Sequence, residues 1–524
     1  MNKHGDYVDM NKDDIERKKL FAGICLALFP TAFSFILVSN ILGQLKNEFI
    51  LTNADVGYIG GAALWGMSIS LLVIGPLLEK IGLKKAAIGA FIGHISGVTL
   101  FLIGYFFQGD PSAFWILFLG AIGMGVGNGM IEVAGNPLTA ALYPDNKTTK
   151  MNHFHSFYPA GLVVGGLLGW VMTQIGDLGA IDVGHWTTQI AIVYIPILIY
   201  GWLLFPRKFP KTETAEAGIP TSEIFKYTFT TLPVLGIIFL TILTLAMEMG
   251  PMRWIPDVLQ SAGLHGILVL VWISGLMFLL RLYAEPFVEK LTPPGMLLVA
   301  SFLTGFGLLM FAFIETGIVL LMLAGAMYAA GIAFFVPTML GLMSEQFPKA
   351  GSLGIVLLLG MGFIGGGVAN AVIGEIADSY LPDALDEQAT VQVLEQVEQE
   401  FPEYVELAEE AAGNTEALAA LGYREAEVRN VLERSEEALA YYQENGEFAG
   451  NLTGNALRAL IDSGLEQEQE LINEASTVLS PADNYGGRMA FLWVSPLAFF
   501  TGIVFIIWFI RDKRRGGYKI QTLE

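Results

Sequence analysis

The chain has 524 residues, of which 53% are hydrophobic and only 15% are charged, and its mean hydropathy is +0.55. Soluble proteins carry about 25% charged residues, so this composition excludes an ordinary soluble domain and indicates a protein that crosses a membrane many times. The formal net charge of −21 arises entirely in residues 378–487, which hold 25 Asp and Glu against 4 Lys and Arg. Because the rest of the chain is balanced, no basic surface for nucleic acid is expected.

Apolar runs long enough to span a bilayer occur in two sets of six. The first set follows an N-terminal tail (1–19) and covers residues 20–42, 56–78, 86–107, 114–141, 155–176 and 187–205. The second set follows a polar linker (206–228) and covers residues 229–250, 265–285, 295–315, 318–343, 352–377 and 489–510. We therefore predict an all-α membrane protein of twelve transmembrane helices, arranged as two six-helix bundles. The predicted units are bundles at 20–205 and 229–377, with helix 12 at 488–511 and a tail at 512–524.

Lysine and arginine are strongly biased toward one side of the predicted membrane. If the N-terminus is cytoplasmic, the opposite short loops hold little beyond Lys46 and Arg253. The positive-inside rule then places both termini in the cytoplasm of a cell with an inner membrane. The acidic insertion, 378–487, is expected outside as a set of short amphipathic helices, interrupted at Gly413–Asn414 and Asn445–Gly446.

The fourth apolar run carries the strongest candidate for a functional site. Asn128, Glu132 and Asn136 are spaced four residues apart in a glycine-rich segment, so they share one stripe of a helix. A carboxylate at this depth costs roughly 2.5–3.5 kcal/mol, so Glu132 should face a polar cavity. Glu132 is therefore the candidate for solute binding or proton coupling. The alternative is a packing helix whose acid pairs with a neighbour.

The two sets of helices resemble repeats of one another. GPLLEKIGLKK begins at Gly75 after the second run, and EPFVEKLTPPG begins at Glu285 after the eighth. Both place an apolar pair before Glu-Lys at a predicted cytoplasmic turn. Two repeated halves predict a central site reached alternately from either side of the membrane.

These motifs resemble those of the major facilitator superfamily, whose loop motif is usually written G-x-x-x-D-[RK]-x-G-[RK]-[RK]. Glu79 stands here in place of the usual aspartate. GNGMIEVAGNP resembles the fucose permease family of sugar–proton symporters, in which a glutamate followed by Ala-Asn-Pro matches Glu132, Asn136 and Pro137. That family also has a functional aspartate in the first helix, where Ser39 stands in this chain. The resemblance implies symport of a monosaccharide or a similar polar solute with a proton, or with sodium.

Other polar residues in apolar runs are weaker candidates for binding or coupling. Glu248 could supply a second acid, or it could pair with Arg253 at the outer boundary. His155 and Tyr158 share a face of the fifth run, although a histidine at a helix start is often a cap. Amides and tryptophans could bind hydroxyls or sugar faces, or could simply pack helices together. These amides and tryptophans are Asn40, Asn128, Asn136, Gln189, Asn370, Trp65 and Trp272.

Charged residues at the turns after the second and eighth runs are expected to act as conformational latches, or only as orientation signals. In the first turn they are Glu79, Lys80, Lys84 and Lys85. In the second, Arg281 is expected to pair with Glu285 or Glu289.

The sequence predicts no enzyme, cofactor or metal site, because no nucleophile–base pair, nucleotide loop or metal-ligand spacing occurs. The favoured function is a monomeric secondary transporter of a small polar solute. The alternatives are an exporter or a nucleoside or drug transporter of the same fold, or a non-transporting receptor that uses the insertion as its sensor.

Overall fold

The computed structural model describes residues 3–49, 51, 53–108, 112–177, 183–260, 266–411, 421, 423 and 425–523. These ranges are almost entirely helical, and eleven of the helices are long and apolar enough to cross a membrane. A shorter apolar helix, Val269–Leu282, stands where the eighth span is predicted. The prediction of an all-α membrane fold is therefore confirmed, and the helices are consistent with twelve spans.

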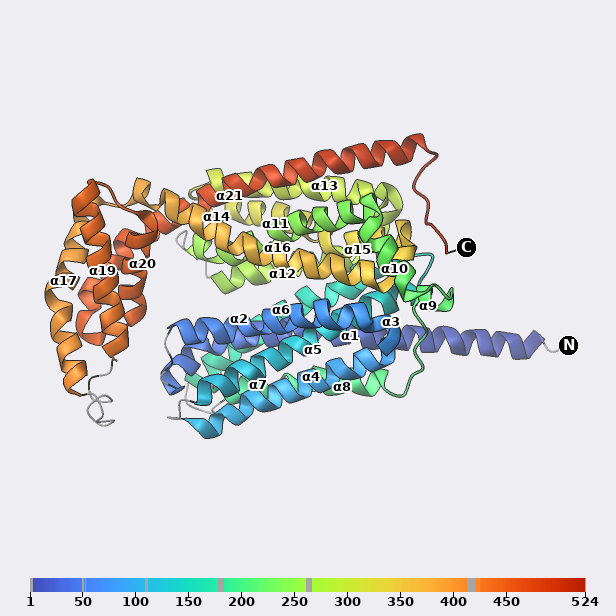
Figure 1. Ribbon diagram of the computed structural model, residues 1–524, viewed down its shortest axis with the longest axis horizontal. Helices are drawn as coiled ribbons and strands as arrows, with labels where there is room; N and C mark the ends of the chain where they lie inside the picture. The colour runs from blue at the N-terminus through green and yellow to red at the C-terminus, as the bar shows by residue number, and fades with distance from the viewer. Residues whose placement is uncertain are drawn as a thin grey trace.

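The helices of the first half lie side by side in the lower part of Figure 1. They are α1 (Lys3–Phe49), α2 (Asn53–Ile69), α3 (Leu78–Ile81), α4 (Leu83–Ile103), α5 (Ser112–Leu142), α6 (Lys147–Asp177), α7 (Trp186–Ala191) and α8 (Tyr194–Leu204). Glycines let α4 and α5 approach closely. A Cβ atom on Gly97 would lie 2.2 Å from the backbone nitrogen of Met124, so only glycine fits there.

The helices of the second half lie above them, joined through a linker that contains α9 (Glu213–Glu216) and α10 (Thr221–Thr230). They are α11 (Leu232–Gln260), α12 (Gly266–Leu282), α13 (Glu285–Phe313), α14 (Ile318–Ile332), α15 (Phe335–Gln346), α16 (Gly351–Tyr380) and α21 (Gln469–Arg514). The tenth predicted span is broken between α14 and α15. Pro337 lacks an N–H, so it cannot continue the helical hydrogen bond to Ala333.

The acidic insertion, which we call the cap (residues 378–487), forms a separate helical unit. Its helices are α17 (Glu387–Glu410), α19 (Glu425–Asn445), α20 (Gly450–Ser463) and the first part of α21. Their apolar faces enclose a small core of their own, with Leu394, Phe401, Leu439 and Leu457 fully buried or nearly so. The expected break at Asn445–Gly446 is present, with Gly446 at φ 71°; Gly413–Asn414 lies outside the described residues.

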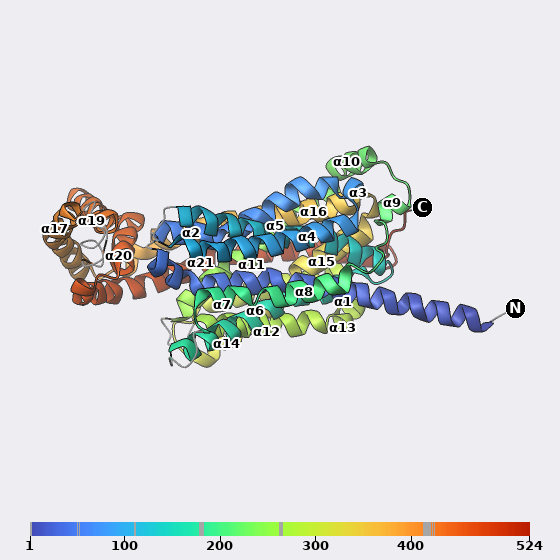
Figure 2. The ribbon, with the colours of Figure 1, turned by 90° about the horizontal axis from the view of Figure 1, so that it is seen from below.

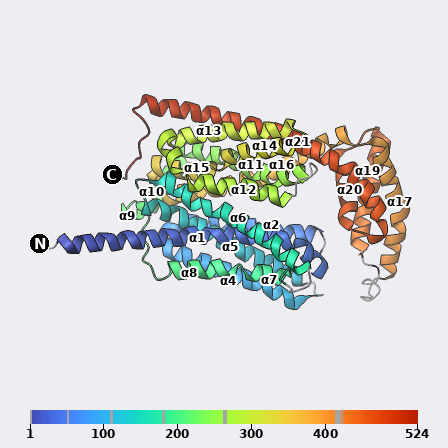
Figure 3. The ribbon, with the colours of Figure 1, turned by 180° about the vertical axis from the view of Figure 1, so that it is seen from behind.

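The cap stands at one end of the transmembrane helices and both chain termini stand at the other (Figures 1 and 2). We call these the cap end and the terminus end. Helix α21 runs without a break from the cap through the transmembrane region (Figure 3), although helix 12 is predicted to begin only at residue 488. Arg458 of α20 bonds Asp378, near the end of α16, at 2.9 Å and Asp483 of α21 at 2.5 Å, which ties α20 to the two helices that enter the transmembrane region.

Candidate substrate and coupling site

The central polar cluster begins with a local contact on α5. Asn136 donates through Nδ2 to Glu132 Oε2 at 2.7 Å, one helical turn away. His155 of α6 then approaches Asn136 Oδ1 through Nε2 at 2.8 Å and lies 3.8 Å from the Glu132 carboxylate. Because Asn136 donates with its nitrogen and accepts with its oxygen, Nε2 of His155 carries the proton in this arrangement. The result is a directed chain of hydrogen bonds that ends on a carboxylate only 3% exposed.

Arg281 of α12 joins this cluster to the second half of the protein. Its Nη2 donates to Glu248 Oε1 of α11 at 3.4 Å, and the pair is buried. Its Nη1 donates to the backbone oxygen of His155 at 3.2 Å. Its Nε donates to the backbone oxygen of Ala333 at 2.6 Å. One planar guanidinium therefore contacts both halves of the protein at three separate acceptors.

Prolines explain why those two backbone oxygens are open to Arg281. In an α-helix the carbonyl of residue i accepts from the N–H of residue i+4. Residue 159 is proline in α6 and residue 337 is proline in α15, so the carbonyls of His155 and Ala333 have no such donor. Each half of the protein thus offers one proline-freed carbonyl, and Arg281 takes both.

The cluster is not fully satisfied. Among the described residues, Glu248 Oε2 is buried without a hydrogen-bond partner. The cluster contains two carboxylates, Glu132 and Glu248, but only one guanidinium, which pairs with Glu248. One negative charge is therefore uncompensated when both acids are ionised and His155 is neutral. A buried charge without compensation costs several kcal/mol. A proton, a cation or a ligand donor would relieve that cost.

The position of Arg281 corrects one expectation. It lies with Glu248 in the buried cluster, whereas Glu285 and Glu289 are exposed at the start of α13. The alternative partner for Glu248 is also absent, because Arg253 is exposed and the guanidinium that reaches Glu248 is that of Arg281. An arginine late in an apolar helix indicated that Arg281 would need an acidic partner. The prediction chose Glu285 or Glu289 because they are near in sequence, whereas the partner is Glu248.

Other predicted site residues are distributed over three places. Tyr158 packs at the contact between the halves, in a small apolar cluster with Leu162 and with Leu270 of α12. Asn128 is bound instead to His94 at 2.9 Å, and Asn40 to Gln189 at 2.8 Å. These two amides hold helices of the first half together, which is the packing alternative considered for them.

A second group lines a pocket of about 380 Å³ between α2 and α16. Trp65 and Asn370, both predicted for binding, lie on opposite walls of this pocket with Met67, Ser68 and Met249. Its walls are mostly apolar. Trp272 is outside it and donates from Nε1 to the backbone oxygen of Met322 at 3.2 Å.

At the terminus end, two glutamates join the halves. Glu79 Oε1 accepts from the hydroxyl of Ser352 at 2.6 Å, across the boundary between the halves. The same carboxylate accepts from Thr212 at 2.6 Å and from Thr214 at 2.9 Å in the linker. Glu79 thus lies where a latch residue is expected, at the junction of both halves with the linker.

Glu345, at the end of α15, is the second of these glutamates and was missed in the sequence. Its Oε1 accepts from the backbone N–H and the hydroxyl of Thr148, both at 2.8 Å. Thr148 lies in the first turn of α6, where backbone N–H groups lack helical partners and favour a negative charge. The available signal was a glutamate directly after the tenth apolar run, in the segment Ser-Glu-Gln-Phe-Pro.

The lysines of the first loop differ in their contacts. Lys84 donates to the backbone oxygens of Phe205 and Arg207, each at 2.9 Å, and so caps the end of α8. Lys80 and Lys85 are exposed. The Lys84 contacts lie within the first half, so they do not join the two halves.

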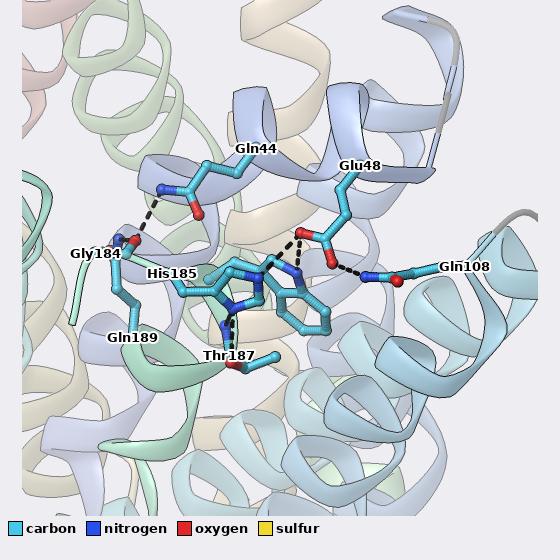
Figure 4. A network of polar contacts seen from close by, with 8 residues as sticks. Gln44, Glu48, Gln108, Gly184, His185, Thr187 and Gln189 are labelled. Carbon is cyan, nitrogen blue, oxygen red and sulfur yellow. Dashed lines mark hydrogen bonds and ion pairs between the residues drawn. The ribbon is translucent and has the colours of Figure 1, made fainter. Parts of the chain in front are cut away.

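The cap end of the first half carries another polar network (Figure 4). Glu48 Oε2 accepts from Trp186 Nε1 at 2.7 Å and lies 3.3 Å from His185 Nε2, while Gln108 donates to its other oxygen. This network fastens the end of α1 to the start of α7. Its sequence signal, a glutamate just past an apolar run, is not distinctive. Among the described residues, no group of three or more His, Cys, Asp or Glu side chains is arranged to hold a metal ion.

Comparison with known proteins identifies the family. The family model of the Major Facilitator Superfamily matches residues 24–381, which is more than half of the chain. The chain belongs to the major facilitator superfamily.

Curated relatives match over shorter stretches. The gentisate transporter of Corynebacterium glutamicum is 24% identical over 243 residues, which are 44% of this chain and 51% of that protein. The L-fucose-proton symporter of Escherichia coli K12 is 28% identical over 153 residues, 28% of this chain and 33% of that protein. The chain therefore spans about half or less of the length of these relatives.

Solved structures share the fold over a larger part. FucP in the outward conformation matches with a TM-score of 0.56 and 19% identity, covering 68% of this chain and 92% of that one. The proton:xylose symporter XylE matches with a TM-score of 0.56 and 15% identity, covering 69% and 89%. At these identities the likeness concerns the fold alone.

Proposed function

We propose that this transporter moves a small neutral polar solute, with a monosaccharide favoured, together with a proton by alternating access. The observation that carries the proposal is the buried polar cluster, which holds two glutamates but one arginine: Glu248 pairs with Arg281, and Glu132 lies beside His155 and Asn136. The L-fucose-proton symporter among the relatives supports the same class. Sodium is the alternative coupling ion.

The charges of the cluster favour a neutral solute. With one acid protonated, the two carboxyls and Arg281 sum to zero, so the empty site can cross the membrane without a buried net charge. A neutral solute preserves that balance. Amide and histidine groups beside Glu132 offer the donors and acceptors that hydroxyls need.

The contacts at the terminus end support a closed cytoplasmic exit. In this proposal the terminus end faces the cytoplasm of a cell with an inner membrane, as the distribution of lysine and arginine predicts. Glu79 and Glu345 join the two halves there. Opening the exit requires these bonds to break, and rocking of the halves would expose the cluster to the other side.

A second candidate substrate is a small aromatic carboxylate. Gentisate is the substrate in the name of one relative, and its match extends over more of this chain than that of the fucose symporter. Arg281 is a suitable partner for a carboxylate, and the pocket between α2 and α16 is mostly apolar. For such a solute, Arg281 would have to leave Glu248.

The test is uptake into proteoliposomes under an imposed proton gradient, with labelled monosaccharides, nucleosides, gentisate and nicotinate offered separately. We expect gradient-driven uptake of one neutral solute, unaffected by removing sodium. Uptake that is accelerated by a sodium gradient and not by a proton gradient would identify sodium as the coupling ion. Uptake of an aromatic acid with no sugar transported would replace the monosaccharide with the second candidate. If none of the solutes moves inward, the exporter reading is favoured.

A further inference from the structure

The C-terminal segment after α21 crosses the terminus end and contacts the junction between the halves. Gly516 and Gly517 have φ values of 91° and 97°, a conformation that favours glycine and turns the chain away from the helix. The segment then runs along the end of the helices (Figure 1). Gln346 donates to the backbone oxygen of Lys519 at 2.6 Å, and the Gln521 N–H donates to the backbone oxygen of Glu345 at 2.8 Å.

The side chain of Tyr518 completes the coordination of Glu345. Its hydroxyl donates to Glu345 Oε2 at 2.6 Å, while Oε1 accepts both bonds from Thr148 of the first half. Glu345 is only 3% exposed. The carboxylate therefore has one oxygen bound to the tail and the other bound across the boundary between the halves.

We propose that Tyr518 is a positioning residue of the cytoplasmic gate, and that the C-terminal segment is a strap that holds the gate closed by orienting Glu345 toward Thr148. This inference deepens the proposed function, since it assumes that the terminus end opens during the transport cycle. It assigns control of that opening to a segment outside the transmembrane helices.

The physical reason is the cost of an unsatisfied buried oxygen. Without the Tyr518 hydroxyl, Glu345 Oε2 loses its donor while the gate is closed, and a buried acceptor without a partner is unfavourable. When the gate opens, water can reach that oxygen. Loss of the hydroxyl therefore destabilises the closed gate more than the open one.

The hydroxyl is suited to this role. Burial, followed by the neighbouring Glu345 carboxylate, raises the pKa of Tyr518 well above its ordinary value. The phenol therefore stays protonated and remains a donor at physiological pH. Tyr518 is also part of the same chain segment as the two backbone contacts, so its position is set independently of Thr148.

The experiment measures gate opening directly and requires no substrate. Cys25 is the only cysteine and is buried, so Cys25→Ala gives a background for a reporter at Ala140→Cys. Ala140 is 3% exposed and lines a small cavity with Ser344 and Gly351 at the junction. The rate of labelling by a membrane-impermeant maleimide is measured in vesicles that expose the terminus end.

We expect Tyr518→Phe to raise the labelling rate about fivefold or more, because a hydrogen bond to a charged group is lost. Deletion of residues 516–524 should do the same. The matched control is Tyr283→Phe, since Tyr283 is 65% exposed at the end of α12, and it should leave the rate unchanged. In a Glu345→Gln background, adding Tyr518→Phe should change the rate less than twofold, because both act at one carboxylate.

Three results would overturn the proposal. One is an unchanged labelling rate for both Tyr518→Phe and the deletion while Thr148→Val raises it. Another is a lower thermal stability of Tyr518→Phe without faster labelling, which would make the tail only a structural support. The third is full additivity with Glu345→Gln. Because no solute is involved, these results are independent of whether the proposed sugar is transported.

Discussion

The central cluster and the terminus-end junction each bring two glutamates to a contact between the two halves, but the hydrogen bonds of those glutamates differ. At the terminus end, Glu79 and Glu345 receive hydrogen bonds from hydroxyl and N–H groups on both carboxylate oxygens. In the central cluster, Glu248 Oε2 has no partner among the described residues, and the one arginine there pairs with Glu248 and not with Glu132.

The difference indicates two roles for one residue type. A carboxylate whose oxygens are all paired is stabilised in one arrangement and suits a gate that is either closed or open. A carboxylate with unused capacity in a buried site is available to a proton or a ligand. The comparison is therefore tested best by substitutions that affect either the gate or the central cluster, but not both.

The largest effect is expected for Glu132→Gln. An amide cannot take up and release the coupling proton, so accumulation in response to a proton gradient should be lost while solute exchange persists. One charge per 100 mV is worth about 2.3 kcal/mol, which corresponds to roughly 50-fold accumulation that would disappear. Counterflow and gradient-driven uptake, measured in the same proteoliposomes, distinguish the two processes. Retained accumulation would remove Glu132 from the coupling step.

Arg281→Met should lower both transport and stability. It leaves Glu248 buried without its cation and two proline-freed carbonyls without a donor, and breaking a buried ion pair costs about 3–5 kcal/mol. Thermal unfolding of the detergent-solubilised protein measures this loss. Adding Glu248→Gln should recover much of the stability but not transport. A single variant as stable as wild type would show that the guanidinium is not needed to satisfy the cluster.

Glu79→Gln should change the access equilibrium while leaving the coupling intact. The amide can accept at one oxygen only, so one hydroxyl among Thr212, Thr214 and Ser352 loses its acceptor, at a cost of about 1–3 kcal/mol. The labelling rate of the Ala140→Cys reporter should rise, whereas the ratio of protons to solute should stay constant. A changed ratio of protons to solute would mean that Glu79 also takes part in coupling, which the comparison assigns to the central cluster alone.

Pro159→Ala should have a moderate effect without unfolding the protein. The new N–H can bond to the His155 carbonyl within α6 and competes with Arg281 for that oxygen, a change worth about 0.5–1.5 kcal/mol. We expect a several-fold lower rate of solute exchange together with equal or higher thermal stability. Pro30→Ala in α1 is the matched control, because its helix contributes no acceptor to Arg281. Equal exchange rates in both variants would argue against the role of freed carbonyls.

The smallest effect is expected for Lys46→Met. Lys46 donates to the backbone oxygen of Asp462 in the cap at 3.0 Å and is partly exposed. Exposed charge contacts contribute about 0–1 kcal/mol, so uptake should stay within about twofold of wild type. A loss of tenfold or more would mean that the cap takes part in the transport cycle and would extend the comparison to the cap end.

Much of the fold could be predicted because it depends on local composition. Runs of apolar residues define the spans, and the charge of residues 378–487 separates the cap from the transmembrane helices. Tertiary packing changed the boundaries. Helix α21 continues into the cap because its first turns bury Leu471, Leu479 and Ala482 there, and apolarity alone could not show this.

The candidate site was predicted where contacts are close in sequence. Glu132 and Asn136 are one helical turn apart, so their hydrogen bond follows from helix geometry. His155 and Glu248 were recognised as polar residues in apolar runs, but their partners were not. Arg281 was assigned to Glu285 or Glu289 because those residues are near in sequence, whereas its actual acceptors lie 33, 52 and 126 residues away.

The sequence by itself thus determined the membrane fold, the two repeated halves, the place of the acidic cap and the local pair on α5. These properties depend on hydrophobicity and helical spacing, which act over a few residues. Only the tertiary structure decided which cation meets which acid, and that Glu345 binds Thr148 and Tyr518. Those pairs depend on how the helices pack, because packing brings together side chains that are far apart in the sequence and that helical spacing cannot pair.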